Sequence, residues 1–449
     1  MQNSIPKFNR EFFKSGEIFT RIGEGEIGGK ANGLAAIHSS LSSKFDRTKY
    51  PLLQVDIPTL TVLTTDIFDE FMTQNDLFSI AQSDNSDHRI ADAFQKATFP
   101  ARYSGDLLAL ISEVHTPLAI RSSSLLEDAL FKPFAGIYAT KMIPNNHPDP
   151  SVRYRKLLEA VKFVYASTFF KEAKAYARCA ESTIEKEKMA VIIQEVVGHR
   201  YGDRYYPIIS GVVKSYNFYP MGKFDPSDGI IDLALGLGKT IVDGGMSWTY
   251  SPAHADCLPP FGNLGELMKK TQTEFWAINM GKPPEYNPLE ETEYLTTNPM
   301  TVADQDGTLK YTASTYNIAT NELIPGVAVK GPRILNFAPI LVQNELPLNS
   351  IAKELLTICE KELESPVEIE FAVTLDPSPA KICKLGFLQV RPMVVSSDKI
   401  EIKDDILRNT EICLRSTELN IESYDLSDPG AKVFRFTCPS ITKEKSRET

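Results

Sequence analysis

One short stretch of the chain combines a fixed positive charge with several hydroxyl groups. Residues 118–140 read LAIRSSSLLEDALFKPFAGIYAT, so Arg121 ends an apolar run and three serines follow it. Arginine stays charged and can hold a phosphate through two hydrogen bonds. Gly136 permits close backbone approach and Thr140 offers a hydroxyl. The pattern indicates a site for an oxygen-rich anion; an ion pair of Arg121 with the acidic pair 127–128, and plain turn roles for Gly136 and Thr140, explain it equally well.

Two later segments place polar side chains at every second position. Glu368 and Glu370 alternate with apolar residues in VEIEFAV, so a strand would present both carboxylates on one face. Paired carboxylates suit magnesium, which prefers oxygen ligands and shares them with phosphates. Gln389 and Arg391 share a face of the next expected strand in the same way. A solvated polar strand face is the alternative for both pairs.

Two glycine-rich loops could also approach a phosphate. GEIGGKANGL (25–34) reads as a turn that opens a helix, where backbone N–H groups would face an anion and Lys30 would add charge. It is not a Walker A motif, because Glu24 stands where that motif needs glycine. GLGKT (236–240) fails in the same way. Lys30 is therefore either a phosphate ligand or an ordinary solvated lysine beside a helix start.

The elements that would position these residues mix helices with strands. Apolar periodicity predicts strands at 55–63, 117–121, 189–197, 207–216, 229–238, 367–373 and 386–395. It predicts helices at 28–39, at 152–180 as one long helix or two, and at 262–281. The second half looks antiparallel, so the sequence predicts an α+β or α/β protein in two lobes. The polar segment after 396 is expected to end in a frayed tail.

Composition limits the classes of function. The 449 residues suggest two to three domains or lobes. A net charge of −10 argues against a general nucleic-acid-binding protein, but a local basic pocket would still suffice for ATP. None of the six cysteines forms a C-x-x-C pair, so zinc and redox motifs are absent. The chain shows neither a signal peptide nor an apolar run near the ~20 residues of a membrane helix, so we expect a cytoplasmic protein and no membrane.

The order of these motifs resembles one known domain. GGKANGLAAI, IRSSSLLED with FAGIYAT, MAVIIQEVV, SGVV, GLG, EIEFAV and LQVRP follow each other as in the nucleotide-binding N-terminal domain of phosphoenolpyruvate synthase (pyruvate, water dikinase) and pyruvate, phosphate dikinase. The resemblance covers roughly 20–395. It implies a two-lobed ATP-grasp fold of α+β type with mixed and antiparallel sheets, which grips ATP between its lobes. We expect lobes at 1–185 and 186–395, and a polar extension at 396–449.

The resemblance also implies phosphate-binding cations. Lys30 matches the lysine of the family's Gly-Gly-Lys loop, and Arg121 matches the arginine of its Arg-Ser-Ser motif. Gly136 and Thr140 keep the family's spacing from that arginine and would be backbone and hydroxyl contacts to the phosphates. Arg391 matches the arginine of Gln-x-Arg, and Arg121 and Arg391 would be the catalytic residues.

The remaining matches concern the rest of the nucleotide and its metal. Gln194 matches the glutamine of the Val-x-x-Gln strand and would lie near the adenine. Glu370 matches the acid of Asp-x-Glu and would hold ribose or magnesium, while Glu368 stands where the family often has aspartate. Gln389 matches the glutamine of Gln-x-Arg. The implied cofactors are ATP and Mg²⁺.

Three departures from the family pattern limit the expected activity. None of the histidines stands in the family's Thr-x-Gly-Gly-x-x-x-His motif, and the chain has no room for the barrel that binds pyruvate. GLGK places Lys239 where an acid is common, and the interval from Glu370 to Gln389, around DPSPAK, is longer than usual. We therefore expect a module that does not run the whole dikinase reaction alone. It would phosphorylate a histidine or another acceptor on a separate protein, bind ATP as a regulatory module, or be a shortened remnant.

Overall fold

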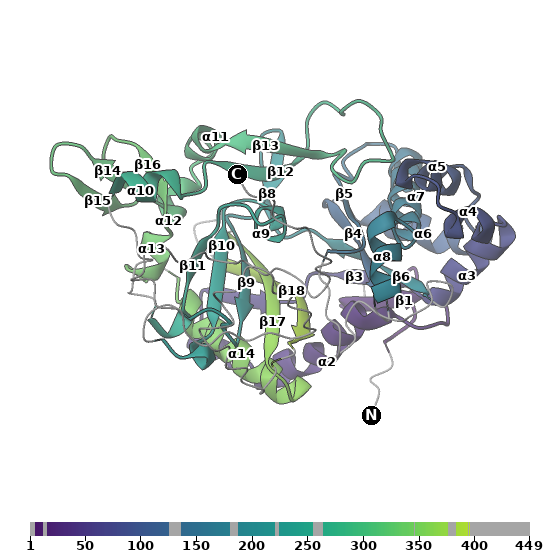
Figure 1. Cartoon of the computed structure of the whole chain (residues 1–449), viewed down its shortest axis with the longest axis horizontal. Coiled ribbons are helices and arrows are strands. Elements are labelled where there is room, and N and C mark those ends of the chain that lie inside the picture. The colour runs from purple at the N-terminus through teal and green to yellow at the C-terminus, as the bar shows by residue number, and fades with distance from the viewer. Residues whose placement is uncertain are drawn as a thin grey trace, which may run out of the picture.

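The computed structural model describes most of the chain, and Figure 1 shows its arrangement. The residues described are 5–11, 16–124, 136–179, 187–220, 224–254, 264–344, 346–375, 383–393 and 395. Helices and strands mix along the chain, and the sheets are mixed or antiparallel, so the expected α+β class is confirmed. Within these residues, no helix has both the length and the apolar character needed to cross a membrane.

The first sheet has five strands among the described residues. In spatial order they are β1 (Phe19–Ile22), β3 (Leu60–Leu63), β6 (Met189–Glu195), β4 (Leu118–Ser124) and β5 (Thr140–Ile143). Strands β1 and β3 pair in parallel, and the other neighbours pair antiparallel. Helices cover one face of it: α3 (Thr65–Gln74), α4 (Phe78–Gln82), α5 (Asp87–Lys96), α6 (Ser104–Glu113), α7 (Pro150–Ser167) and α8 (Lys171–Cys179).

Alternation along the central strand separates two hydrophobic cores. Val191 and Ile193 of β6 point to the helical layer and join a core that includes Phe71 and Tyr165. Ile192, between them, points to the other face and packs in the core that continues under α2 (Gly28–Lys44) and the second sheet. Burial on both faces explains why MAVIIQEVV has a nearly continuous apolar run rather than strict alternation.

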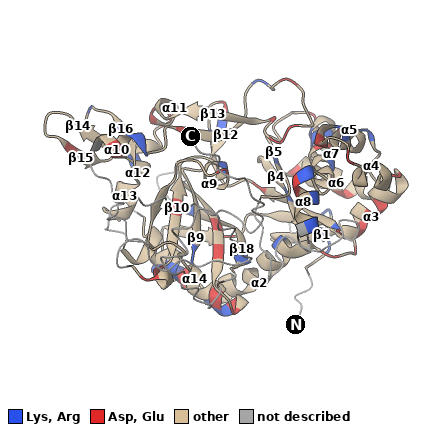
Figure 2. Ribbon diagram, in the orientation of Figure 1, with Lys and Arg blue, Asp and Glu red and all other residues tan. Residues whose placement is uncertain are grey.

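The second sheet has six strands, antiparallel except where its last strand joins. Its order is β11 (Trp248–Tyr250), β10 (Ile230–Ala234), β9 (Ile209–Lys214), β17 (Val367–Leu375), β18 (Cys383–Pro392) and β2 (Leu53–Asp56). Helix α14 (Leu348–Leu363) packs against β17 and β9, and α2 packs against β18. The opposite face carries the polar side chains, and Figure 2 shows acidic residues on β17.

Two smaller sheets occupy the upper part of Figure 1. The third sheet has the order β13 (Leu295–Pro299), β12 (Glu274–Asn279), β8 (Arg204–Tyr206) and β7 (His199–Tyr201), and the fourth has β15 (Glu322–Pro325), β14 (Ala313–Asn317) and β16 (Arg333–Leu335). The short helices α11 (Met300–Gln305) and α12 (Leu309–Thr312) connect these two sheets. Three more short helices lie before or after them in the chain: α9 (Lys239–Val242), α10 (Leu264–Lys269) and α13 (Ala338–Leu341). Single 3-10 turns lie at Arg47–Lys49, Ala101–Tyr103, Pro226–Asp228 and Pro252–His254.

Two element predictions were wrong. The segment 55–63 is not one strand: β2 and β3 belong to different sheets, and the chain crosses between them around Pro58, which cannot donate to a strand ladder. The segment 262–281 is not one helix, because α10 ends at Lys269 and β12 follows. Between them the amide of Gln272 bonds both the N–H and the carbonyl of Leu235, which ties the start of β12 to the end of β10.

Other predictions agree with the structure in kind and differ in length. The helix expected at 28–39 extends to Lys44, the strand expected at 117–121 extends to Ser124, and 152–180 forms two helices. The hairpin around DPSPAK and the tail after 396 lie outside the described residues. The expected division at 185/186 stays a proposal; strand β2 pairs with β18, and β6 pairs with β3 and β4, so hydrogen-bonded sheets cross that position in both directions.

Candidate active site

Arg121 joins the first sheet to the second. It leaves β4 toward β17 and β18, where its guanidinium donates to Glu370 Oε2 (2.8 Å), Gln389 Oε1 (2.7 Å) and the carbonyl of Leu388 (3.0 Å). The alternative partners at 127–128 lie outside the described residues. A planar guanidinium with several N–H groups is suited to gather oxygens from two strands at once. Arg121 is therefore the centre of a polar cluster between the sheets.

Gln194 brings a third strand into this cluster. Its Oε1 accepts a hydrogen bond from Arg121 (3.4 Å), and the residue is 2% exposed on β6. Its Nε2 is buried and has no hydrogen-bond partner in the described structure. A buried amide donor without an acceptor is costly in a folded protein, so such a group calls for a specific reason. An acceptor atom of a ligand bound beside Arg121 would supply one.

The pairing of β17 with β18 places a second pair of polar side chains two residues along from Glu370 and Gln389. Glu370 lies opposite Gln389, and Glu368 lies opposite Arg391, so all four side chains share one face. Arg391 binds the Glu368 carboxylate through Nε (2.8 Å) and a terminal nitrogen (2.6 Å). Both predicted pairs, Glu368 with Glu370 and Gln389 with Arg391, therefore lie on the face that meets Arg121.

Lys214 extends this face and was missed from the sequence. It lies opposite Glu368 on β9, and its Nζ is 3.2 Å from Glu368 Oε2. Asp232 of β10 and Thr249 of β11 follow on the same face and bond each other. The register with β17 shows that Lys214 lies on the same side of the sheet as Glu368. The face thus has two cations around one carboxylate.

The glycine loop reaches the cluster from the other direction. Lys30 is buried in α2, and its Nζ donates to the carbonyl (3.2 Å) and Oγ (3.0 Å) of Ser122, the residue after Arg121. Gly28 has φ +76°, and a Cβ there would stand 1.7 Å from the carbonyl oxygen of Ser123, so only glycine fits. One N–H of the first helical turn is already used, because Ala31 N–H donates to Ser123 Oγ (3.1 Å).

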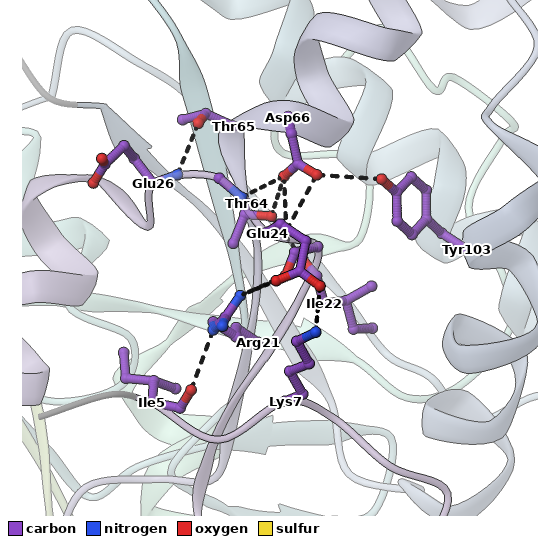
Figure 3. Close-up of polar contacts among 12 residues, drawn as sticks. Ile5, Lys7, Arg21, Ile22, Glu24, Glu26, Thr64, Thr65, Asp66 and Tyr103 are labelled. Atoms are coloured by element: carbon purple, nitrogen blue, oxygen red, sulfur yellow. Dashed lines mark hydrogen bonds and ion pairs between the residues drawn. The ribbon is translucent and has the colours of Figure 1, made fainter.

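A carboxylate at the start of α3 fixes the loop that precedes α2, as Figure 3 shows. Asp66 accepts hydrogen bonds from the N–H groups of Glu24 and Gly25 and from the hydroxyls of Thr64 and Tyr103. Burial raises the pKa of Asp66, but these hydrogen bonds outweigh it, so the pKa lies below its ordinary value. The loop is therefore held from the side of the helical layer.

Thr140 and Gly136 are placed less completely. Thr140 lies opposite Arg121 in the β4–β5 register, so their side chains share a face. Gly136 has φ +79°, and no contact joins it to the cluster in the described structure. The structure thus joins Arg121 with Gln194, Glu370 and Gln389, and it places Glu368 and Arg391 on the same face. Lys30 bonds the neighbouring Ser122, and Thr140 shares only a strand face with Arg121.

The same cluster has the donors and acceptors that a nucleotide needs. Arg121, Arg391 and Lys214 carry positive charge, and Gln194 has an unused donor. Among the described residues no three His, Cys, Asp or Glu side chains gather as a metal site. Two carboxylates on one face fit magnesium only if phosphates complete its shell, which is the usual arrangement for this ion.

Comparisons with known proteins agree with this arrangement. The family model described as the pyruvate phosphate dikinase AMP/ATP-binding domain matches residues 24–410. That range includes every residue of the cluster. No curated protein matches the chain.

Proposed function

The chain belongs to the pyruvate phosphate dikinase AMP/ATP-binding domain family, and on that premise we propose that it is an ATP-dependent phosphotransferase module. The architecture is that of a two-lobed ATP-grasp protein. The observation that carries the proposal is the position of Arg121, which links β4 to β17 and β18 through oxygens that a phosphate can replace. The family match covers residues 24–410, a range that includes Arg121 and the residues that it contacts.

We assign the phosphate contacts to the cations of the cluster. Arg121 and Arg391 hold phosphate oxygens and stabilise the negative charge that develops during phosphoryl transfer. Lys30 holds the strand segment that follows Arg121, and we assign it a supporting contact to the phosphates. Thr140 offers a hydroxyl on the same face as Arg121, and Gly136 remains a proposed backbone contact.

We assign the remaining residues to contacts with the adenine base and with magnesium. Gln194 Nε2 donates to an acceptor atom of the adenine, which gives the unpartnered amide its hydrogen bond. Glu370 and Glu368 are the residues that would hold magnesium, with Gln389 beside them. Magnesium bound there would supply positive charge next to the phosphates. Glu370 would then lose part of its hydrogen bonding to Arg121, and Arg121 would bind phosphate oxygens in its place.

The proposed acceptor is a histidine on a separate protein. In the transfer, the bond from phosphorus to its leaving oxygen breaks while the acceptor nitrogen forms a new bond to phosphorus. Paired acceptors of the pyruvate, water dikinase type would leave AMP and inorganic phosphate as products. A regulatory module that binds ATP without transfer is the second candidate, and one observation favours it: both proposed metal ligands are paired with cations, Glu370 with Arg121 and Glu368 with Arg391.

Phosphorus NMR distinguishes these candidates. The protein is incubated with ATP and magnesium, and the products are followed over hours. AMP with inorganic phosphate supports the dikinase-type transferase, and ADP alone indicates a simple kinase or a hydrolase. Unchanged ATP together with tight binding fits both the regulatory module and a transferase that awaits its acceptor protein. The variant Arg121→Met, which removes the proposed clamp, serves as the control and is expected to give no products above background.

A further inference from the structure

A segment between two strands of the third sheet reaches across to the first sheet. Residues 280–294, which we call the strap, connect β12 to β13 and extend toward β5 and α7 (Figure 1). Lys141 of β5 pins the strap: its Nζ donates to the carbonyls of Pro288 (2.9 Å) and Glu290 (2.7 Å) and binds the Glu293 carboxylate (2.8 Å). Three partners occupy the three protons of the ammonium group, so this attachment is complete.

The strap also places a carboxylate on the residue next to Lys141. The backbone N–H of Thr140 donates to Glu291 Oε1 at 3.1 Å. Thr140 starts β5, which is the edge strand of the first sheet in the described part of the chain, so no further strand there receives this N–H. Thr140 lies opposite Arg121, and the two side chains share a face. An acid therefore sits at the edge where the proposed function places nucleotide phosphates.

We propose that the Glu291 carboxylate occupies a phosphate-oxygen position at Thr140, so that Glu291 sets the affinity of the site for polyphosphate. The inference rests on the proposed function, because it assumes that phosphates reach Thr140. A carboxylate and a phosphate oxygen compete for the same N–H and repel each other. ATP must then displace Glu291 while Lys141 keeps the rest of the strap in place.

The surroundings of Glu291 decide how its charge responds to pH. Burial raises the pKa of this carboxyl, and the Thr140 N–H opposes that effect. The charged groups around it are Lys239 and Asp243 from α9 and Lys141 from β5; the two lysines lower the pKa, and Asp243 raises it. Lys239 is itself 3.0 Å from Asp243, so its charge is shared. Because the net shift is upward, Glu291 loses its charge at a higher pH than an ordinary glutamate.

The direction in which pH should change ATP affinity therefore follows. Ionised Glu291 weakens ATP binding, and protonated Glu291 does not. As pH falls through the pKa of Glu291, wild-type affinity should approach that of a variant without the charge. ATP also takes up protons in this range, but it does so for both proteins, so the ratio of the two dissociation constants reports on Glu291 alone.

The test is calorimetric titration of magnesium-ATP and of AMP into the full chain and two variants. Glu291→Gln removes the charge and keeps an oxygen that can accept from Thr140, so it should fold normally. Glu285→Gln removes the same charge from an exposed position of the strap and is the matched control. At pH 7.5 we expect Glu291→Gln to bind ATP about fivefold to tenfold more tightly than wild type, as for the loss of one nearby like charge. AMP, which carries a single phosphate, should bind both proteins alike.

Each outcome decides the inference. Tighter ATP binding by Glu291→Gln alone, with a ratio that falls toward one as the pH is lowered, supports it. Wild type that binds ATP with the same affinity as Glu291→Gln overturns it and leaves the proposed function standing. Weaker binding by Glu291→Gln also overturns it, because Glu291 would then assist binding. If no protein in the set binds ATP, both the inference and the proposed function fail.

Discussion

Two ion pairs, whose cations lie on neighbouring strands, differ clearly in burial. Arg121 of β4 and Glu370 lie 2.8 Å apart with side chains 12% and 27% exposed, whereas Lys141 of β5 and Glu293 lie 2.8 Å apart with side chains 1% and 2% exposed. The first pair can exchange one oxygen partner for another, because water or a ligand can reach it. The second pair cannot, because separation would leave two charges in the interior.

The difference shows how one sheet supports both a binding cluster and a fixed scaffold. Burial lowers the pKa of Lys141, and Glu293 opposes that change, so the charge is kept by its partner. Two backbone carbonyls complete its shell. Arg121 also bonds one backbone carbonyl, that of Leu388, but its other partners are side-chain oxygens of Glu370, Gln389 and Gln194, which can rearrange. Substitutions at the two positions should therefore affect different quantities.

The largest effect is expected on stability, at Lys141. Lys141→Met leaves the Glu293 carboxylate buried and unpaired, which should cost about 3–5 kcal/mol of unfolding free energy. Urea denaturation followed by circular dichroism measures it. The double variant Lys141→Met with Glu293→Leu should recover much of the loss, because an apolar pair replaces the ionic one. Equal stability of wild type and Lys141→Met would mean that the pair is not structural.

Substitution of Arg121 should affect ATP affinity more than the free energy of unfolding. Arg121→Met is expected to weaken magnesium-ATP binding by about 2–3 kcal/mol, roughly 30-fold to 150-fold, because a clamp on the phosphates is lost. Its unfolding free energy should change much less than that of Lys141→Met. Arg102→Met, which removes an exposed arginine paired with Glu70, is the matched control and should leave affinity unchanged. A large loss of unfolding free energy in Arg121→Met would show that the Arg121–Glu370 pair is as structural as the Lys141–Glu293 pair.

Arg391 should contribute less to ATP binding than Arg121. Lys214 also contacts Glu368, so a cation remains on that face when Arg391 is removed. We expect Arg391→Ala to weaken binding about tenfold, or ~1.4 kcal/mol. Calorimetry on Arg391→Ala and on the double variant with Lys214→Met checks this explanation. If the double variant binds no worse than Arg391→Ala, Lys214 does not share the role.

A smaller effect on stability is expected at Asp66, and it depends on pH. The pKa of Asp66 is lowered in the folded protein, so its contribution to stability is present above the unfolded pKa and is lost as pH falls through the folded one. Asp66→Asn should therefore lower stability at pH 7 and show a shallower loss between about pH 4 and pH 2. Thermal denaturation across that range measures the slope. Parallel curves for both proteins would show that Asp66 does not hold the loop through its charge.

The smallest effect on binding is expected at Cys383. This residue begins β18, is buried, and has a pKa raised to about 12 by burial. Cys383→Ser should cost some stability, because a hydroxyl replaces a weakly polar thiol in the core. ATP affinity should change by less than about twofold, since Cys383 and Gln389 lie toward opposite ends of β18. A large loss of affinity would show that the start of β18 belongs to the binding cluster.

The sequence predicted the α+β class, and for the candidate site it predicted which side chains share a strand face. Alternation alone put Glu368 with Glu370 and Gln389 with Arg391, because a strand has a fixed period of two. The family resemblance added Gln194 and Lys30, which local pattern did not connect with Arg121. Neither could show that Lys30 bonds Ser122, since that contact depends on how α2 meets β4.

The failures have a common physical cause, which is that pairing between distant strands is not written in local periodicity. Strand β2 reads like the start of β3, yet it pairs with β18. Lys214 looked like an ordinary strand residue until the β9–β17 register placed it beside Glu368. Glu291 lies in a polar connection with no strand or helix pattern, and only the pinned strap brings it to Thr140.

The most direct test of the central claim is a calorimetric titration of magnesium-ATP into wild type and Arg121→Met, with unfolding free energies measured on the same samples. The account predicts saturable binding by wild type, binding by Arg121→Met that is at least about 30-fold weaker, and nearly equal stabilities. Equal affinities in two equally stable proteins would contradict it, because Arg121 would then take no part in holding the nucleotide.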